Sequence, residues 1–333
     1  MNANDFISPL GPVMARFIAL KQALGRRYDS ERRILGYLDT FLASKAPDGA
    51  DLTAATFSDW CQTLAPLCAS TRRNRLWIVH QFCRYRRRSE PACFIPDPAL
   101  FPPINPPRPP YWFTPAELLR LLQAADALTP TPHSPLRPAV MRVSLVLLYT
   151  LGLRRSELVS LRLGDLDPLE RTLAVQAGKF HKARLLPLSA DAFAAVQRYL
   201  QVRTAAGFRA DREAPLLCHG RQGALGYGGA GLHQGLSALF QDAGLRSSDG
   251  RLPRVHDFRH HFAIQVLRRW YEAGADVQAK LPLLSLYMGH VSIASTAYYL
   301  PFVTDLAMRA SERFEAYGGA LITPQHDQAG GQG

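Results

Sequence analysis

The chain has 333 residues, of which 47% are hydrophobic, and a formal net charge of +12. A single hydrophobic core rarely accommodates this length, so we expect two domains, with enough apolar side chains to fill both cores. The excess of Lys and Arg favours a polyanionic partner, although charge alone does not separate nucleic acid from an anionic membrane surface.

Other features argue against secreted, membrane-spanning and disulfide-stapled classes of protein. The start, MNANDFISPL, lacks the basic lead and apolar core of a signal peptide. The most apolar run, residues 139–153, is interrupted by Arg142 and is too short to span a bilayer. The five cysteines are odd in number and show no CxxC spacing, which predicts reduced thiols rather than a zinc site or a disulfide framework. We expect a soluble intracellular protein without a membrane partner.

Residues 6 to about 88 have a helical pattern. After Ser30, a candidate N-cap, apolar residues such as Ile34, Leu38 and Phe41 recur at intervals of three and four. No strand pattern competes with this periodicity. We therefore expect residues 1–94 to form a helical first domain.

The last helix of this domain, roughly residues 70–87, carries arginines near both ends, with apolar residues such as Trp77 and Phe82 between them. One interpretation is a solvated basic face on a core helix. The other is a helix that lies along DNA and contacts its phosphates, which the net charge of the chain favours. The arginines predicted to bind DNA are Arg72, Arg73, Arg75, Arg84, Arg86 and Arg87.

A proline-rich stretch, residues 95–112, follows. Its eight prolines disfavour both helix and strand and predict a semi-rigid extended connector between the domains. The second domain, which we place at residues 113–320, opens with Thr114, Pro115 and Glu117, a capping box with proline at the first helical position.

The second domain begins with helical patterns and continues with short strands. Residues 171–176 and 183–188 are typical of two strands, and the basic turn AGKFHK between them predicts a β-hairpin with lysines at its tip. Residues 189–206 have a helical pattern, and 207–231 are rich in loop-forming residues. The tail, 321–333, is expected to be disordered.

Candidate chemical groups recur through the second domain. His256 and Arg259 are three residues apart, so on a helix their side chains share one face. His290 precedes Tyr299 by nine residues. Our hypothesis is that these residues surround a phosphate that the tyrosine attacks. A phenol with a pKa near ~10 is protonated at neutral pH, so it needs a base or a strong positive potential to react.

Four segments share an order with a known family. They are LGLRRSELVSLRLGDLD, GKFHKARLLPL, HDFRHHFA and GHVSIASTAYYL. In residue identity, order and separation they resemble the motifs of the tyrosine recombinases of the phage integrase family, over about residues 111–317. The resemblance implies a mainly α protein, with a helical SAM-like core-binding domain and an α+β catalytic domain that contains a small β-sheet.

The resemblance also implies how the phosphate is held. Arg154 and Arg259 would grip the non-bridging oxygens of the scissile phosphate, because two planar guanidinium groups can bind it bidentately and offset the charge of the transition state. His256 and His290 would add hydrogen bonds, and His256 would also take the proton of the tyrosine.

The nucleophile and the general acid each have a rival next to them. The resemblance implies that Tyr299 attacks and forms a 3′-phosphotyrosyl link. The adjacent Tyr298 points about 100° away on a helix, so only one of the two can face the phosphate. Lys179 is implied as the general acid that protonates the 5′-hydroxyl leaving group, and Lys182 is its competitor.

Neighbouring polar residues receive supporting roles. We predict that Arg155 and Lys182 contact DNA, and that His260 and His261 pack in the protein or contact the DNA backbone. Glu157 is predicted to orient a neighbouring arginine. No carboxylate cluster of metal-binding spacing accompanies these residues, so we expect chemistry without a divalent metal, and the resemblance implies no cofactor.

The leading hypothesis is therefore a site-specific recombinase or integrase that cuts and rejoins double-stranded DNA through a Holliday junction, for a mobile element. The resemblance implies a homotetramer assembled on DNA, with other recombinases as alternative partners, linked through segments near 302–317, and a cytoplasmic, nucleoid-associated location in a bacterium. We expect the two domains to clamp the duplex. The alternatives are a type IB topoisomerase and a DNA-binding protein that has lost its activity.

Overall fold

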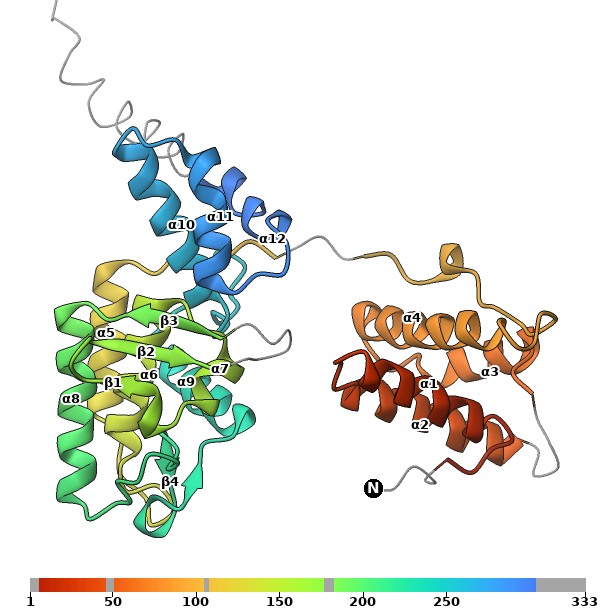
Figure 1. The fold of residues 1–333 in the computed structure, drawn as a ribbon, viewed down its shortest axis with the longest axis horizontal. Coiled ribbons are helices and arrows are strands. Elements are labelled where there is room, and N and C mark those ends of the chain that lie inside the picture. The colour runs from red at the N-terminus through yellow and green to blue at the C-terminus, as the bar shows by residue number, and fades with distance from the viewer. Residues whose placement is uncertain (1–5, 46–50, 105–107, 177–182, 304–333) are drawn as a thin grey trace, which may run out of the picture. The chain divides into compact units, whose positions relative to one another are not determined.

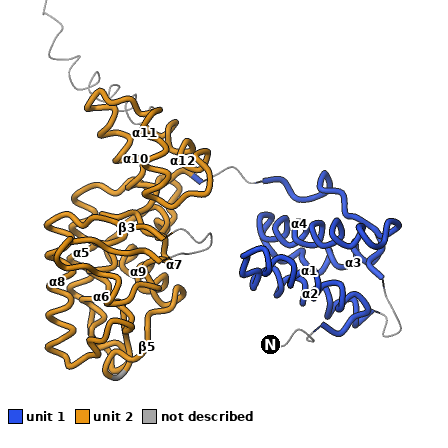
Figure 2. Tube along the Cα trace, in the orientation of Figure 1, with its two compact units in different colours: residues 1–108 blue, residues 109–333 orange. Residues whose placement is uncertain are grey.

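The computed structural model describes residues 6–45, 51–104, 108–176 and 183–303. The chain divides into two compact units, Met1–Arg108 and Pro109–Gly333 (Figure 2). Within the described ranges, no helix is long and apolar enough to cross a membrane. The predicted tail, 321–333, lies outside the described residues.

Unit 1 is helical, as predicted. Its helices are α1 (Gly11–Ala23), α2 (Asp29–Lys45), α3 (Ala54–Thr63) and α4 (Ala69–Arg86). They share one core in which apolar side chains from all four helices are buried, among them Met14, Phe17, Leu35, Leu38, Trp60, Val79 and Phe82.

The prediction that Ser30 is the N-cap of this helix is wrong. The amide of Arg32 donates to the carbonyl of Tyr28 at 2.9 Å, so the first helical turn already includes Ser30. The start of α2 therefore lies at Asp29, whose carboxylate stands in the first turn, where an acidic side chain is favourable.

The proline-rich stretch is not extended throughout. Asp97 accepts a hydrogen bond from the amide of Ala99 at 2.9 Å and caps a 3₁₀ turn, η1 (Pro98–Leu100), which begins with proline because proline is compatible with a first helical position. Phe101 is buried in the core of unit 1. The first part of the stretch therefore packs as part of unit 1.

Unit 2 is built around α6 (Arg137–Leu151), which is buried over most of its length. It contacts α5 (Pro115–Asp126), α8 (Ala190–Ala205), α9 (Gly229–Asp242) and α10 (Asp257–Glu272) (Figure 1). The predicted capping box at the start of α5 is confirmed.

In that capping box, Thr114 Oγ1 accepts from the amide of Glu117 at 3.2 Å, and the Glu117 carboxylate accepts from the amide of Thr114 at 2.8 Å. The second domain thus opens with a helix whose first turn has its amide donors satisfied.

A three-stranded antiparallel sheet lies beside these helices in the order β1 (Leu166–Asp167), β2 (Thr172–Val175), β3 (Arg184–Pro187). The predicted hairpin is confirmed, with Thr172 opposite Pro187 and Val175 opposite Arg184. Its tip, residues 177–182, lies outside the described residues.

The loop-rich prediction for residues 207–231 is wrong in part. The short strands β4 (Cys218–His219) and β5 (Leu225–Gly226) pair there, with a 3₁₀ turn, η3 (Arg221–Gly223), between them. Strands of two residues are too short to produce an alternating pattern in the sequence.

The remaining elements of unit 2 frame the candidate site. A short helix, α7 (Arg155–Ser160), follows α6, and a 3₁₀ turn, η2 (Leu163–Asp165), follows α7. After α10 come α11 (Val277–Met288) and α12 (Ala294–Ala297). Helices α10, α11 and α12 group at one end of the unit (Figure 1), where α10 and α11 share a second core with Tyr299 and Val303.

Candidate functional site

Arg259 lies in the first turn of α10 with only 1% of its surface exposed. Its Nη1 donates to the carbonyl of Gly152 at 2.8 Å, and its Nη2 donates to the carbonyl of Met288. Burial and the neighbouring Arg154 guanidinium lower the pKa of Arg259 to about 10. Arg259 is therefore a buried cation that ties the end of α6 to the end of α11.

Arg154 reaches the same place from the residue before α7. Its Nη2 donates to the carbonyl of Gly289 at 2.8 Å, and its Nη1 donates to Glu157 at 2.7 Å. About a third of its side chain is exposed. Each guanidinium has five N–H donors, and the bonds named here use two on Arg154 and two on Arg259.

Glu157 is a buried carboxylate that connects the arginines. It accepts a second hydrogen bond from the amide of Arg154, and its Oε2 lies 4.0 Å from Arg259 Nη1. Burial raises the pKa of Glu157, but hydrogen bonds from Arg184 and Arg154 outweigh that effect and hold the pKa below its ordinary value. The expected orienting role of Glu157 remains our proposal, and this geometry supports it.

Arg184, at the start of β3, is a site residue that the sequence reasoning missed. Its guanidinium donates to both oxygens of Glu157, and its Nε donates to the carbonyl of Tyr287 at 2.7 Å. Its side chain is 9% exposed. The one signal in the sequence was its position in GKFHKARLLPL, two residues after Lys182.

His290 and Tyr299 lie near Arg154 and Arg259, whose charges act on both side chains. His290 Nδ1 shares a hydrogen bond of 2.8 Å with Thr296 Oγ1, which is fully buried. The His290 and Tyr299 rings are nearly parallel, with centroids 6.3 Å apart. Burial and the nearby Arg259 lower the pKa of His290 to about 4, so its imidazole is neutral at pH 7.

Of the two adjacent tyrosines, Tyr299 points inward. It is 3% exposed, and its hydroxyl lies 3.2 Å from Nδ1 of His260. Burial raises the pKa of Tyr299, while the positive charge of Arg259 acts in the opposite direction. Tyr298 is half-buried and packs its ring edge-on against Phe302, with centroids 5.2 Å apart.

His256 lies at the start of α10 and is exposed. Its ring stands edge-on to that of His260, with centroids 4.6 Å apart. Partial burial of the ring against its neighbours and the charge of the Arg259 guanidinium lower the pKa of His256. His256 therefore occupies the outer side of the cluster, next to the residues that surround Tyr299.

This arrangement is a cationic cluster beside a phenol. Its guanidinium groups and neutral imidazoles offer hydrogen-bond donors to a phosphate oxygen. In this structure Tyr299 and Arg259 are closed to solvent, so a phosphate reaches them only after the side chains that cover them shift. Among the described residues, no group of three His, Cys, Asp or Glu side chains is placed to hold a metal ion.

The two lysines predicted at the hairpin tip, Lys179 and Lys182, lie outside the described residues. The described strands β2 and β3 end in the pair Val175 and Arg184. Arg184 itself bonds Glu157, so this end of the two strands lies at the site.

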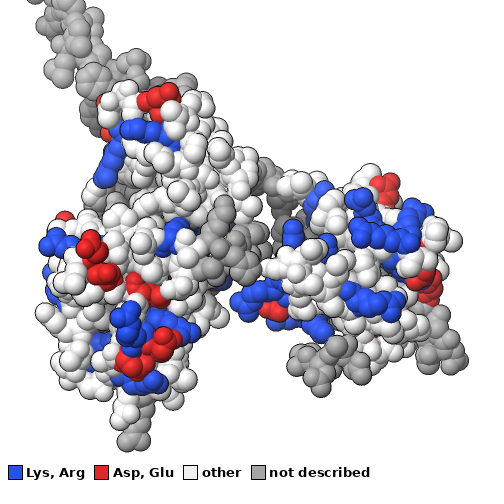
Figure 3. All heavy atoms as spheres, viewed as in Figure 1, with Lys and Arg blue, Asp and Glu red and all other residues white. Residues whose placement is uncertain are grey.

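The predicted DNA-binding arginines of unit 1 fall into groups. On the face drawn in Figure 3, Lys and Arg side chains gather over unit 1. Arg84 and Arg87 are exposed. Arg72, Arg73 and Arg75 are partly buried: Nη1 of Arg73 donates to the carbonyl of Pro102 at 2.7 Å, and the Arg75 guanidinium lies 4.8 Å from the centre of the Tyr37 ring. In unit 2, Arg155 is exposed at the start of α7.

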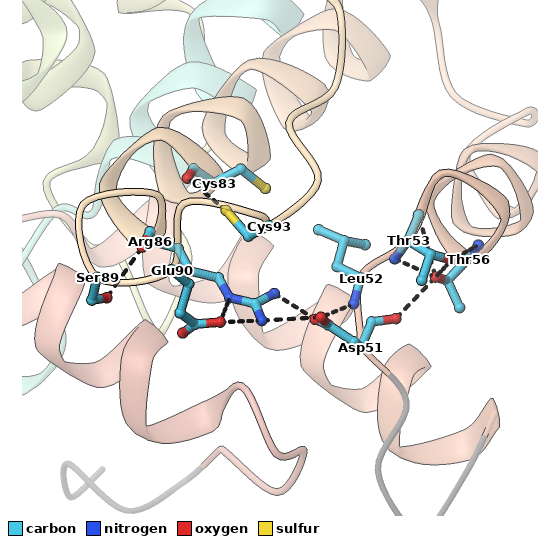
Figure 4. Close-up of polar contacts among 9 residues, drawn as sticks. All are labelled: Asp51, Leu52, Thr53, Thr56, Cys83, Arg86, Ser89, Glu90 and Cys93. Atoms are coloured by element: carbon cyan, nitrogen blue, oxygen red, sulfur yellow. Dashed lines mark hydrogen bonds and ion pairs between the residues drawn. The ribbon is translucent and has the colours of Figure 1, made fainter.

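Arg86 requires a correction. Its side chain is 8% exposed, and its guanidinium donates to both oxygens of Asp51 and to Glu90 (Figure 4). These bonds tie the end of α4 to the segment before α3. Since the guanidinium is buried and paired inside the unit, we assign Arg86 a structural role and remove it from the DNA contacts that we propose.

Comparison with known proteins gives the following matches. The model of the phage integrase family matches residues 111–302. Protein y4rB of Sinorhizobium fredii, whose name describes an integrase/recombinase, is 33% identical over 93% of this chain and 98% of its own length. Tyrosine recombinase XerD of Mycobacterium tuberculosis is 30% identical over 89% of this chain and 88% of its own length.

Solved structures share the fold. The Tn1549 transposon integrase in complex with transposon right-end DNA has a TM-score of 0.62 at 17% identity, covering 90% of this chain and 98% of that one. The XerH site-specific recombinase bound to difH DNA has a TM-score of 0.61 at 19% identity, covering 86% and 79%.

Proposed function

This chain belongs to the phage integrase family of tyrosine recombinases, and from that premise we propose that it is a site-specific DNA recombinase. In the proposed reaction it cuts and rejoins strands of double-stranded DNA through a 3′-phosphotyrosyl intermediate and a Holliday junction. One observation carries the proposal. Tyr299 lies in a cluster whose positive charge comes from Arg154 and Arg259, and the His290 ring is nearly parallel to the tyrosine ring at 6.3 Å between centroids.

Each proposed role follows from the chemistry of these groups. Arg154 and Arg259 hold the non-bridging oxygens of the phosphate and offset the charge that develops during attack. His256 and His290 donate further hydrogen bonds. Lys179 protonates the 5′ oxygen as it leaves.

The covalent intermediate explains how strands are rejoined. When Tyr299 displaces the 5′ oxygen, the phosphodiester energy is kept in the phosphotyrosyl bond, so the reverse attack by a 5′-hydroxyl needs no ATP. Charge stabilisation comes from the guanidinium groups in this scheme, and no divalent metal takes part.

We further propose that two exposed arginines at the end of α4, Arg84 within the helix and Arg87 just after it, contact the DNA backbone together with Arg155. A guanidinium on a phosphate positions the protein without reading the sequence. This assignment is supported by their exposure and by the charge of the chain.

Exchange between two duplexes needs four active sites, so we propose a tetramer assembled on DNA. Support comes from apolar side chains exposed at the C-terminal end of the described chain. Leu283 and Leu286 on α11 are 60% and 65% exposed, and Val291 and Ile293 follow them at 56% and 49%. Segments beyond residue 303, which we expected to link protomers, lie outside the described residues.

The preferred setting is a mobile element. The name of the relative y4rB describes an integrase/recombinase, and a transposon integrase shares the fold. A type IB topoisomerase is the alternative function. It would relax supercoiled DNA without forming junctions between paired sites, so a junction assay separates the two functions.

The test is covalent attachment to a nicked suicide substrate made from the DNA that flanks the gene. We expect a protein–DNA adduct with the wild type and with Tyr298→Phe, and none with Tyr299→Phe. An adduct that is lost in Tyr298→Phe and retained in Tyr299→Phe would assign the nucleophile to the other tyrosine. Without an adduct from the wild type on any strand of these sites, the proposed function fails.

A further inference from the structure

His260 contacts the reacting atom of the proposed nucleophile. It lies one helical turn after His256 on α10, so the two side chains share a face. Its Nδ1 is 3.2 Å from the hydroxyl oxygen of Tyr299, and the two rings meet edge to face with centroids 5.5 Å apart. Among the described residues, the hydrogen-bond partner of this hydroxyl is His260 and not His256.

The protonation states suit a proton transfer from the tyrosine to the histidine. Burial and the neighbouring His256 lower the pKa of His260 to about 4, so its imidazole is neutral at pH 7. Burial raises the pKa of Tyr299, which keeps its proton at rest. With the proton of His260 on Nε2, the hydroxyl of Tyr299 donates and Nδ1 accepts. The titratable and charged groups facing His260 are His256, Asp257, Arg254 and Arg259 around the start of α10, and Tyr298 and Tyr299 after α12.

We propose that His260 is the general base of the strand-cleavage step, an inference that rests on the proposed function. The O–H bond of Tyr299 breaks and its proton moves to Nδ1 of His260. The phenolic oxygen forms a bond to phosphorus, and the bond between phosphorus and the 5′ oxygen breaks. That oxygen takes a proton from Lys179. In rejoining, the attacking 5′-hydroxyl gives its proton back to Lys179 and His260 returns its proton to Tyr299, so the cycle needs no other reactant.

This assignment differs from the role that the family resemblance implied for His256. That residue is exposed on the outer side of the cluster, and its ring meets His260 edge-on. His260 stands between His256 and Tyr299. In our scheme His256 contacts the phosphate and His260 handles the proton.

The low pKa of His260 means that the proton is transferred only when DNA is bound. An imidazole with a pKa of about 4 is too weak a base to hold the proton of a phenol. A phosphate placed among these cations adds negative charge beside the ring, which favours the protonated imidazole. The base therefore gains strength when the substrate is in place.

The test is the single-turnover rate of covalent attachment on the nicked suicide substrate, for the wild type, His260→Ala and His260→Gln. A lost general base should lower the rate by ~10²- to 10⁴-fold. We expect the rate of both variants to rise steeply with pH, since only the ionised tyrosine then attacks, and we expect a shallower profile for the wild type. His233→Gln, which changes an exposed histidine on α9, is the matched control and should react like the wild type.

A substrate with sulfur in place of the bridging 5′ oxygen distinguishes the loss of the general acid from the loss of the general base. A thiolate leaves without a proton, so the sulfur restores the rate of a variant that lacks the general acid and leaves the His260 defect in place. Rescue of His260→Ala by sulfur would overturn the proposal, as would a rate within about threefold of the wild type or above it. The melting temperature and DNA affinity of each variant show whether a rate is lost through misfolding. If His260→Ala misfolds, the rate of His260→Gln decides the outcome.

An unreactive wild type would count against the proposed function itself. A reactive wild type with unaffected His260 variants would count against this inference alone.

Discussion

Arg184 and Glu157 form a buried pair with two parallel hydrogen bonds, Nη1 to Oε1 at 3.1 Å and Nη2 to Oε2 at 2.9 Å. The same carboxylate accepts from Arg154 and lies 4.0 Å from Arg259. One negative charge thus serves three guanidinium groups. The excess positive charge that remains is what would attract a phosphate.

Replacing Glu157 by glutamine should destabilise unit 2 and impair cleavage. The change leaves the buried Arg184 without its counter-charge, and breaking such a pair from one side typically costs ~3–5 kcal/mol. Urea unfolding measures the loss. Glu170→Gln, at an exposed position, is the control and should stay within about 0.5 kcal/mol of the wild type.

A double-mutant cycle with Arg184→Met tests whether the loss belongs to this pair. If the two residues act together, the double variant should be less unstable than the sum of the single variants by ~0.5–3 kcal/mol. Strict additivity would show that Glu157 matters through its other partners.

Gly289 should tolerate no side chain. Its φ is +62°, and a Cβ there would lie 2.8 Å from Arg184 Nη1 and 3.6 Å from Arg154 Nη1. Gly274 has a similar φ of +63° with open space around it. Gly274→Ala should therefore cost only the backbone strain of ~1–2 kcal/mol, whereas Gly289→Ala should cost more and also slow covalent attachment. Equal stability and equal cleavage rates in the two variants would contradict this reasoning.

Sequence reasoning predicted the elements and the order of the motifs, but not all the contacts within the site. The hairpin followed from alternation in residues 171–176 and 183–188, and its described strands match. Arg184 was read only as part of a strand, because its partners Glu157 and Tyr287 are 27 and 103 residues away in the sequence. A single sequence has no periodicity that brings them together.

The same limit explains His260 and Arg86. His260 was predicted only to pack in the protein or contact the DNA backbone, because its contact with Tyr299 depends on where the chain after α12 packs. Arg86 looked like its exposed neighbours, since its partner Asp51 is 35 residues away. The spacing of residues in the sequence predicts which side chains share a face of a helix. Which residues that face contacts depends on the tertiary packing.

Alanine variants of Arg86 and Arg84 should distinguish a structural arginine from one proposed to bind DNA. Arg86→Ala removes hydrogen bonds to Asp51 and Glu90, whose carboxylates are 50% and 41% exposed and stay hydrated, so it should lower the stability of unit 1 by ~1.5–3 kcal/mol. Arg84→Ala removes an exposed side chain and should change stability by less than about 0.5 kcal/mol. Chemical unfolding followed by circular dichroism distinguishes them, and similar losses in both would refute the structural role of Arg86.

DNA affinity should fall steeply with salt. If Arg84 and Arg87 contact phosphates, each alanine variant should reduce the slope of log K against log salt by about one and weaken binding to all sequences alike. Fluorescence anisotropy between 50 and 200 mM salt, roughly the range where such contacts show, measures the slope. Unchanged slopes in both variants would place the DNA on another face.

His261 should make the fold sensitive to acid. It is 1% exposed, packs against the rings of Trp112 and Tyr149, and its Nδ1 has no hydrogen-bond partner among the described residues. Burial and the charge of Arg268 lower its pKa from 6.5 to about 4. Between these values the unfolded chain binds a proton that the folded chain does not, so stability is full above pH 6.5 and falls as the pH drops toward 4.

The expected loss from His261 is about 3 kcal/mol at pH 4, taking ~1.4 kcal/mol for each unit of pKa. His261→Phe keeps a ring in the aromatic surroundings and removes the proton site. The difference in unfolding free energy between variant and wild type isolates His261 from other histidines, because their contributions cancel. That difference should move in favour of the variant from pH 7 to pH 4. Parallel stability curves would mean that the imidazole finds solvent or a partner when it is protonated.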